Sequence, residues 1–170
     1  MAVKSVSGAD VLIDVMKASG DFLERHPINK RLSQEGKKPA NMLWFWGQGK
    51  ATQLPPFRQV YGLNAACISA VDIVRGIGRL AGMDILQVPG ITGYFDTDYK
   101  AKADYALKAL DTHDFVLVHV EPTDEAGHMG RADLKVKAIE DTDQLVVGTL
   151  LEGLKRRGEP YAILVVCDHP

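Results

Sequence analysis

Two pairs of acidic and imidazole side chains have the types and spacing of metal ligands. Asp124 lies four residues before His128, just after an apolar run. Asp168 and His169 are adjacent and directly follow another apolar run. Mixed oxygen and nitrogen ligands suit Mn²⁺, Zn²⁺ or Mg²⁺. An isolated Asp-x-x-x-His sequence is more often a solvated loop, so the position of both pairs in the fold decides their meaning.

The apolar runs predict the scaffold that would bring these pairs together. Runs without alternation of polar and apolar residues are typical of strands covered on both faces, and they occur at 42–46, 65–69, 84–88, 115–120 and 162–167. Helical patterns lie between them, at about 72–81, 99–110 and 133–155. This alternation predicts an α/β fold with a largely parallel sheet flanked by helices. Ligand sites in such sheets lie beyond the carboxyl ends of the strands, where both pairs fall.

The N-terminal part of the chain has a different pattern. Residues 7–23 carry apolar side chains at helical spacing, with Ser7 and Asp10 as a predicted N-terminal cap, and the helix should stop before Pro27. Residues 27–39 are polar and basic, which is typical of a surface connection. We therefore expect a helical lead-in and linker over 1–40 and a metal-binding α/β catalytic segment over 41–170.

The overall composition excludes several classes of protein. The 170 residues include 20 basic and 22 acidic side chains, with a formal net charge of -2, so no basic field is available to hold a nucleic-acid backbone. No apolar run approaches the roughly 20 residues that span a bilayer, and no signal-peptide pattern is present. Cys67 and Cys167 fall in apolar runs and are predicted to be reduced and buried. We expect a cytoplasmic protein without membrane or nucleic-acid partners.

Six segments carry a resemblance to a known family: 26–29, 39–49, 69–78, 90–97, 124–128 and 168–170. In this order they resemble the 2,3-bisphosphoglycerate-independent phosphoglycerate mutases of the archaeal type, which belong to the alkaline phosphatase superfamily. Members interconvert 3-phosphoglycerate and 2-phosphoglycerate at a two-metal site, through a phosphorylated serine. The resemblance implies an alkaline phosphatase-like core and a small phosphorylated substrate.

The resemblance also implies roles for individual residues. Asp124 and His128 would bind one divalent ion, and Asp168 and His169 the other, with Mn²⁺ or Mg²⁺ expected and Zn²⁺ as a further option. Two cations can neutralise charge on the transferred phosphoryl group and activate a serine hydroxyl. Arg75 resembles the basic position that meets the phosphoryl group, and its planar fork matches phosphate oxygens.

Three parts of the family's site have no counterpart in this sequence. They are an N-terminal Asp, the nucleophilic serine and a further His ligand, so we expect a partial segment that is inactive by itself. Ser69, at the end of a predicted strand, is the nearest competitor for the nucleophile. A metal-dependent phosphatase or phosphodiesterase of the same superfamily, or a non-catalytic metal-binding or dimerising piece, remains an alternative, and the oligomeric state is left open.

Other side chains have less specific interpretations. The loop 90–98 is expected to border the substrate pocket. His119 lies on the strand that leads to Asp124 and is the one remaining histidine expected near the site. Four lysines on predicted helices are expected to lie on solvated faces: Lys100, Lys102, Lys135 and Lys137.

Overall fold

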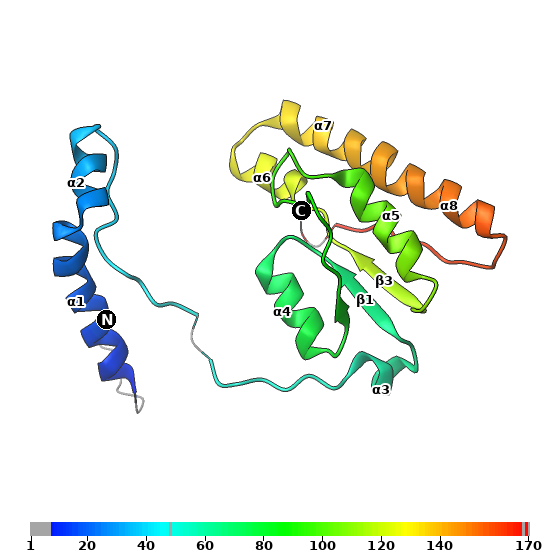
Figure 1. The fold of residues 1–170 in the computed structure, drawn as a ribbon, viewed down its shortest axis with the longest axis horizontal. Coiled ribbons are helices and arrows are strands. Elements are labelled where there is room, and N and C mark those ends of the chain that lie inside the picture. Colours follow the sequence, from blue (N-terminus) through cyan, green and yellow to red (C-terminus); the bar gives the residue numbers. More distant parts are fainter. Residues whose placement is uncertain (1–7, 48, 168, 170) are drawn as a thin grey trace. The chain divides into compact units, whose positions relative to one another are not determined.

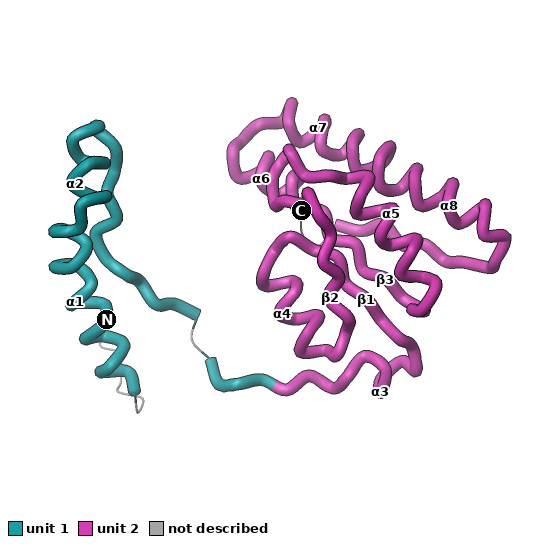
Figure 2. Tube along the Cα trace, in the orientation of Figure 1, with its two compact units in different colours: residues 1–52 teal, residues 53–170 magenta. Residues whose placement is uncertain are grey.

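The computed structural model describes residues 8–47, 49–167 and 169 (Figure 1). The chain divides into two compact units, residues 1–52 and residues 53–170 (Figure 2). The division expected from the sequence, at residue 40, stays a prediction. Among the described helices, none is long and apolar enough to cross a membrane.

The first unit contains two consecutive helices, α1 (Ala9–Arg25) and α2 (Pro27–Gln34). Proline disfavours the helical conformation in the residue before it and is well suited to the first turn of a helix. His26 is accordingly extended, with ψ 132°, and its Nδ1 accepts a hydrogen bond from the Ile28 backbone at 3.3 Å. α1 therefore stops before Pro27 as predicted, but the expected surface connection begins as a helix. Ser7, the predicted cap, lies outside the described residues.

Two buried polar side chains fix the extended segment that follows α2. The Asn29 amide donates to the carbonyls of Leu23 and Ala40, both at 2.8 Å, and its oxygen accepts from the Ala40 N–H at 3.1 Å. The Ser19 hydroxyl accepts from the Leu43 N–H at 2.8 Å. Because both side chains are buried, these bonds hold residues 40–43 against the two helices.

The second unit is built on a parallel sheet of three strands, β1 (Ala65–Ile68), β2 (Asp84–Ile85) and β3 (Phe115–Val118), in the order β2-β1-β3. The central strand is buried along its whole length, as its unalternated apolar residues predict. Its last residue, Ile68, pairs with Val118 of β3. The helices of this unit are α3 (Phe57–Tyr61), α4 (Asp72–Leu80), α5 (Tyr99–Ala109), α6 (Pro122–His128), α7 (Ala132–Asp141), the π-helical turn η1 (Thr142–Gly148) and α8 (Thr149–Arg157).

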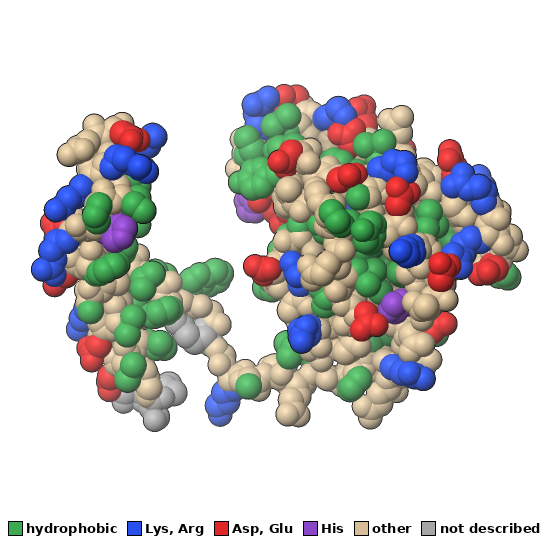
Figure 3. All heavy atoms as spheres, viewed as in Figure 1, with side chains coloured by type: hydrophobic (Ala, Val, Ile, Leu, Met, Phe, Trp, Pro, Cys, Tyr) green, Lys and Arg blue, Asp and Glu red, His purple; other side chains and the backbone are tan. Residues whose placement is uncertain are grey.

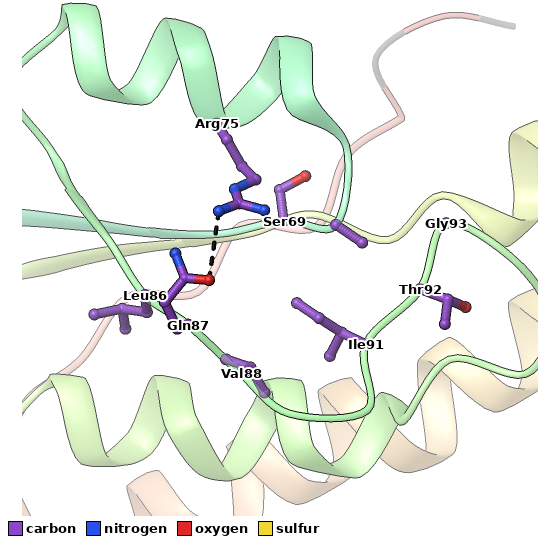
Figure 4. Close-up of a pocket in the computed structure, with 9 residues that line it drawn as sticks. Ser69, Arg75, Leu86, Gln87, Val88, Ile91, Thr92 and Gly93 are labelled. Carbon is purple, nitrogen blue, oxygen red and sulfur yellow. Dashed lines mark hydrogen bonds between the residues drawn. The ribbon is translucent and has the colours of Figure 1, made fainter.

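Helices cover both faces of the sheet. Successive residues of a strand point to opposite faces, and Cys67 packs against Gly78 of α4 while Ile68 packs against Ala106 of α5. Figure 4 shows α4 on one side of β1 and α5 on the other. α7, η1 and α8 form a continuous helical stretch that contacts the outer side of α5. The predicted α/β architecture is confirmed.

Two of the five predicted strands do not form in the part of the chain that the structure describes, so these two predictions are wrong. Residues 42–46 and 162–167 carry no assigned strand, and their side chains are largely exposed, with Trp46 and Leu164 each at 82%. An apolar run becomes a strand only if an adjacent segment forms hydrogen bonds with its backbone N–H and C=O groups. Cys67 lies in a paired run and is buried, whereas Cys167 lies in an unpaired one and is exposed, contrary to its prediction.

Candidate metal centre and adjoining pocket

The turn between β3 and α6 positions the first predicted pair. β3 ends at Val118 and α6 starts with Pro122 in its first turn. Residues four apart lie on one face of a helix, and the His128 Nε2 lies 3.2 Å from the Asp124 Oδ2. The Asp-x-x-x-His spacing thus produces a contact between carboxylate and imidazole at the carboxyl end of a strand.

A residue from the C-terminal segment reaches the same carboxylate. The His169 Nε2 lies 3.3 Å from the Asp124 Oδ1, so each oxygen of Asp124 faces one imidazole. A cation bonded at about 2.1 Å holds adjacent ligand atoms roughly 3 Å apart, which matches both separations. Three of the four predicted metal ligands are therefore together, and the fourth, Asp168, lies outside the described residues.

Further carboxylates surround Asp124. Glu121, Asp124 and Glu125 are all partly buried, and each offers an oxygen within 4.8 Å of the others. Three carboxylates this close repel one another, and a divalent cation with oxygen ligands would relieve that repulsion. The donor set therefore fits a hard divalent ion. Glu121 was not selected from the sequence, although its place at the end of β3, three residues before Asp124, was a usable signal.

Arg75 lines a pocket next to this cluster. Its cavity of about 240 Å³ is bordered by Ser69, Ala70, Arg75, Leu86, Gln87, Val88, Ile91, Thr92 and Gly93 (Figure 4). The Arg75 guanidinium donates to the Gln87 side chain at 3.4 Å, and its contact with Asp72 is 4.0 Å. Both contacts are long, so the cationic charge is only weakly neutralised by the protein and suits an anionic ligand.

The loop between β2 and α5 forms the rim of this pocket, as predicted. The Thr97 hydroxyl oxygen accepts from the Thr92 N–H at 2.9 Å, and Asp98 caps α5 by accepting from Ala101 at 2.8 Å. A Cβ placed at Gly93 would lie 3.9 Å from the Cγ of Glu121. The pocket and the acidic cluster are therefore neighbours.

Ser69 borders the pocket but does not present its hydroxyl to it. The Ser69 side chain is 1% exposed, and its oxygen accepts from the Val71 N–H at 3.0 Å. The same oxygen lies 3.2 Å from the His119 Nδ1. Figure 4 shows the hydroxyl directed away from the Arg75 guanidinium. This geometry supports the expectation that Ser69 is not the nucleophile.

Lys102 is not on a solvated face, contrary to the expectation from the sequence. It is fully buried, and its ammonium donates to the His119 carbonyl at 2.9 Å. Burial lowers the pKa of Lys102 to about 8, and the nearby negative charge of Glu121 opposes this shift. The helical pattern did not reveal this because α5 is covered on two sides, by the sheet and by the outer helices.

Comparison with known proteins identifies the family. A model of the Metalloenzyme superfamily matches residues 8–170, and the chain belongs to this superfamily. It is 51% identical over 161 residues to the 2,3-bisphosphoglycerate-independent phosphoglycerate mutase of Methanosarcina barkeri, and 50% identical over 163 residues to a probable enzyme of that name from Geobacter sulfurreducens. These matches cover 95% and 96% of this chain. The predicted resemblance is confirmed.

The coverage of the relatives is incomplete. The chain spans 40% of the Methanosarcina protein and 41% of the Geobacter protein. Among solved structures, the PH0037 protein of Pyrococcus horikoshii matches 85% of this chain with a TM-score of 0.73 and 36% identity. The cofactor-independent phosphoglycerate mutase of Thermoplasma acidophilum matches 88% with a TM-score of 0.52 and 30% identity. The chain covers 38% and 36% of these two structures.

Proposed function

We propose that this chain is the metal-carrying catalytic segment of a phosphoglycerate mutase that interconverts 3-phosphoglycerate and 2-phosphoglycerate. The observation that carries the proposal is the meeting of Asp124, His128 and His169 at the end of β3, beside the pocket of Arg75. The relatives that bear this name cover nearly the whole chain at about half identity. Membership of a metalloenzyme superfamily agrees with the local donor set.

In this proposal the site holds two divalent ions. Asp124 and His128 bind one, and Asp168 and His169 bind the other, with Mn²⁺ or Mg²⁺ favoured over Zn²⁺ because carboxylates dominate the cluster. The ions, when bound, neutralise charge on the phosphoryl group and lower the pKa of the attacking hydroxyl. The side chains of this chain would hold the ions in place, with the carboxylates located just beyond the carboxyl end of β3.

The proposal assigns the pocket to the phosphoryl group of the substrate. The Arg75 guanidinium would bind phosphate oxygens in a fork, displacing its long contact with Gln87. The serine that receives the phosphoryl group is assigned to sequence outside this chain, because Ser69 turns its hydroxyl towards Val71 and His119. The 170-residue chain by itself is therefore expected to be inactive.

A hydrolase is the second candidate, and one observation favours it. The His128 and His169 side chains are 75% and 58% exposed, so water has access to the candidate metal centre. A metal-dependent phosphatase or phosphodiesterase would use that water as the nucleophile. A piece that binds metal without catalysis is the remaining alternative.

The proposal also covers the location of the protein in the cell and its partners. On the face shown in Figure 3, the acidic and basic side chains of residues 53–170 are interspersed, which offers no continuous basic surface to a nucleic acid. We infer a cytoplasmic protein that acts on a small phosphorylated molecule, without a membrane or nucleic-acid partner. Its oligomeric state is to be measured by light scattering.

Two measurements test the function. Isothermal titration of the chain with Mn²⁺ should show binding, and Asp124→Asn should weaken it by more than the roughly tenfold to hundredfold typical of supporting residues. Asp133→Asn, an exposed carboxylate in α7, is the control and should bind as the wild type does. Wild-type chain that binds no Mn²⁺ would contradict the metal centre.

The second measurement distinguishes the reactions. The chain, and a longer chain that also carries the remaining length of the relatives, are each incubated with 3-phosphoglycerate and Mn²⁺. We expect 2-phosphoglycerate from the longer chain and no turnover from the shorter one. Inorganic phosphate as the main product would favour the hydrolase, and turnover by the 170-residue chain would show that it needs no outside serine.

A further inference from the structure

A chain of polar contacts lies between the pocket and the acidic cluster. The pairing of Ile68 with Val118 continues one residue further, because the His119 N–H donates to the Ile68 carbonyl at 2.8 Å. Ser69 and His119, which are 50 residues apart in sequence, each follow the last residue of one of these adjacent strands, and the Ser69 Oγ lies 3.2 Å from the His119 Nδ1. The His119 Nε2 lies 3.3 Å from the Glu121 Oε2.

The partners of these groups determine the direction of the hydrogen bonds. The Ser69 oxygen accepts from the Val71 N–H, so its own proton is available to the His119 Nδ1, which is closer than the Val71 carbonyl at 3.4 Å. The Nδ1 then accepts, so the ring proton lies on the Nε2, which faces the Glu121 Oε2 across a polar contact of 3.3 Å. We assigned this tautomer of His119 from its hydrogen-bond partners.

Glu121 is available for this contact because it does not cap its helix. It occupies the N-cap position of α6, yet its side chain makes no hydrogen bond to the first turn. Its backbone carbonyl accepts from the Asp124 N–H at 2.8 Å, so Glu121 and Asp124 share one tight turn. The position of the Glu121 carboxylate within the cluster therefore depends on what its side chain contacts.

The buried Lys102 forms a hydrogen bond with the backbone next to the same turn. Its ammonium donates to the carbonyl of His119, the residue that carries the imidazole of this network. Removing an ammonium from water is unfavourable by several kcal/mol unless it gains hydrogen bonds and opposite charge, and here the carbonyl and the nearby Glu121 supply both. This hydrogen bond anchors the backbone at residue 119. The positive charge of Lys102 also offsets part of the negative charge of the nearby Glu121.

We propose that His119 is a positioning residue for the metal centre, and that its Nε2–H holds the Glu121 carboxylate in place beside Asp124. The inference rests on the proposed metal site. Hydrogen-bonded supports of this kind orient the groups that bind a metal and typically change its affinity by about tenfold to hundredfold. Ser69 orients the imidazole, and Lys102 anchors its backbone.

Two variants at position 119 test the contacts of the two imidazole nitrogens separately. The amide of asparagine reaches the place of Nδ1, so His119→Asn keeps an acceptor for Ser69 and loses the contact with Glu121. The amide of glutamine reaches the place of Nε2, so His119→Gln keeps a donor for Glu121 and loses the bond to Ser69. We expect His119→Asn to raise the Kd for Mn²⁺ of the chain by about tenfold or more, and His119→Gln to change it by less than about threefold.

The two variants also control for a purely structural role. Each loses one polar contact of the imidazole and some volume, so their thermal unfolding midpoints without metal should be similar. A role limited to packing would leave their affinities for Mn²⁺ similar as well, and that result would overturn the proposal for His119 alone. If the wild-type chain binds no Mn²⁺, the metal site fails and the proposal fails with it.

A variant of Glu121 keeps the inference testable if His119→Asn does not fold. Glu121→Gln preserves the length of the side chain at a partly exposed position and removes its charge. We expect it to weaken Mn²⁺ binding by about tenfold. An unchanged Kd would show that the carboxylate held by His119 does not serve the cation, and would overturn the proposal.

Discussion

Three charged side chains of the second unit differ in which groups lie close to them. Asp124 faces two imidazoles, one on each oxygen. Arg75, by contrast, has only long contacts with Gln87 and Asp72. Lys102 is fully buried and gains a carbonyl and a nearby carboxylate. These differences lead to separate predictions for Arg75 and Lys102.

Replacing Arg75 with lysine tests the assignment of the pocket. Arg75→Lys keeps the positive charge but removes the planar fork proposed to bind two phosphate oxygens, so we expect kcat/KM of the longer chain proposed to be active to fall by about tenfold or more. Arg79→Lys, an exposed position of the same helix, is the matched control and should retain full activity. Unchanged kinetics in Arg75→Lys would remove Arg75 from the substrate site.

Replacing Lys102 with methionine tests its burial through pH. Below about pH 8 Lys102 is charged in both the folded and unfolded chains, and burial of the charge opposes folding. Between pH 8 and 10.5 the folded chain releases this proton while the unfolded chain keeps it, so folding becomes more favourable as pH rises. The free energy of unfolding of the wild type should therefore increase relative to that of Lys102→Met over this range.

Urea denaturation of both proteins between pH 7 and 10 measures this difference. Lys108→Met, on the exposed part of the same helix, gives the effect of removing a lysine from α5 without a buried charge. A difference between wild type and Lys102→Met that does not change with pH would contradict the lowered pKa of Lys102.

The helix α5 has other elements packed on two of its sides. It contacts β1 and β3 on the sheet side and η1 and α8 on the outer side. Gly153 of α8 allows the outer contact, since a Cβ at this position would overlap the Leu107 Cδ1 and lie 2.7 Å from its Cδ2. Close packing at this point brings α8 near to α5.

Adding a single methyl group at Gly153 tests that contact. Gly153→Ala should lower the free energy of unfolding by about 1 to 3 kcal/mol, because the Leu107 side chain must move from a packed position. Gly76→Ala, within α4, meets no atom within 4 Å and should be neutral or stabilise by up to about 1 kcal/mol. Equal effects of the two substitutions in thermal or urea denaturation would contradict the close packing at Gly153.

At the scale of the whole molecule, the candidate chemistry is confined to the second compact unit. Arg75, Asp124, His128 and His169 all belong to residues 53–170. The sheet, its covering helices and the network through His119 lie in the same unit. The relatives extend well beyond this chain, which spans about 40% of their length.

A shorter chain tests this confinement. Residues 53–170 expressed alone should unfold cooperatively and should bind Mn²⁺ with a Kd within about threefold of that of the 170-residue chain. Asp124→Asn introduced into the shorter chain is the control and should weaken the binding as much as it does in the 170-residue chain. A shorter chain that folds but fails to bind Mn²⁺ would show that residues 1–52 take part in the metal centre.

The sequence by itself determined the class of fold and much of the candidate site. Alternation of apolar runs with helical patterns predicted the parallel α/β unit, because burial on both faces and helical periodicity are local properties of the chain. The Asp-x-x-x-His spacing predicted the contact between Asp124 and His128, since residues four apart meet on a helix. The ordered motifs predicted the family.

The tertiary structure alone decided which distant groups meet and which apolar runs become strands. The register of β1 and β3 places Ser69 beside His119, and the cover on two sides of α5 buries Lys102. Neither fact has a local signal, because each depends on packing between segments far apart in the chain. The same reason explains the two wrong strand predictions, at 42–46 and 162–167. The sequence shows that these segments are apolar, but only the fold determines whether another segment lies beside them and forms backbone hydrogen bonds.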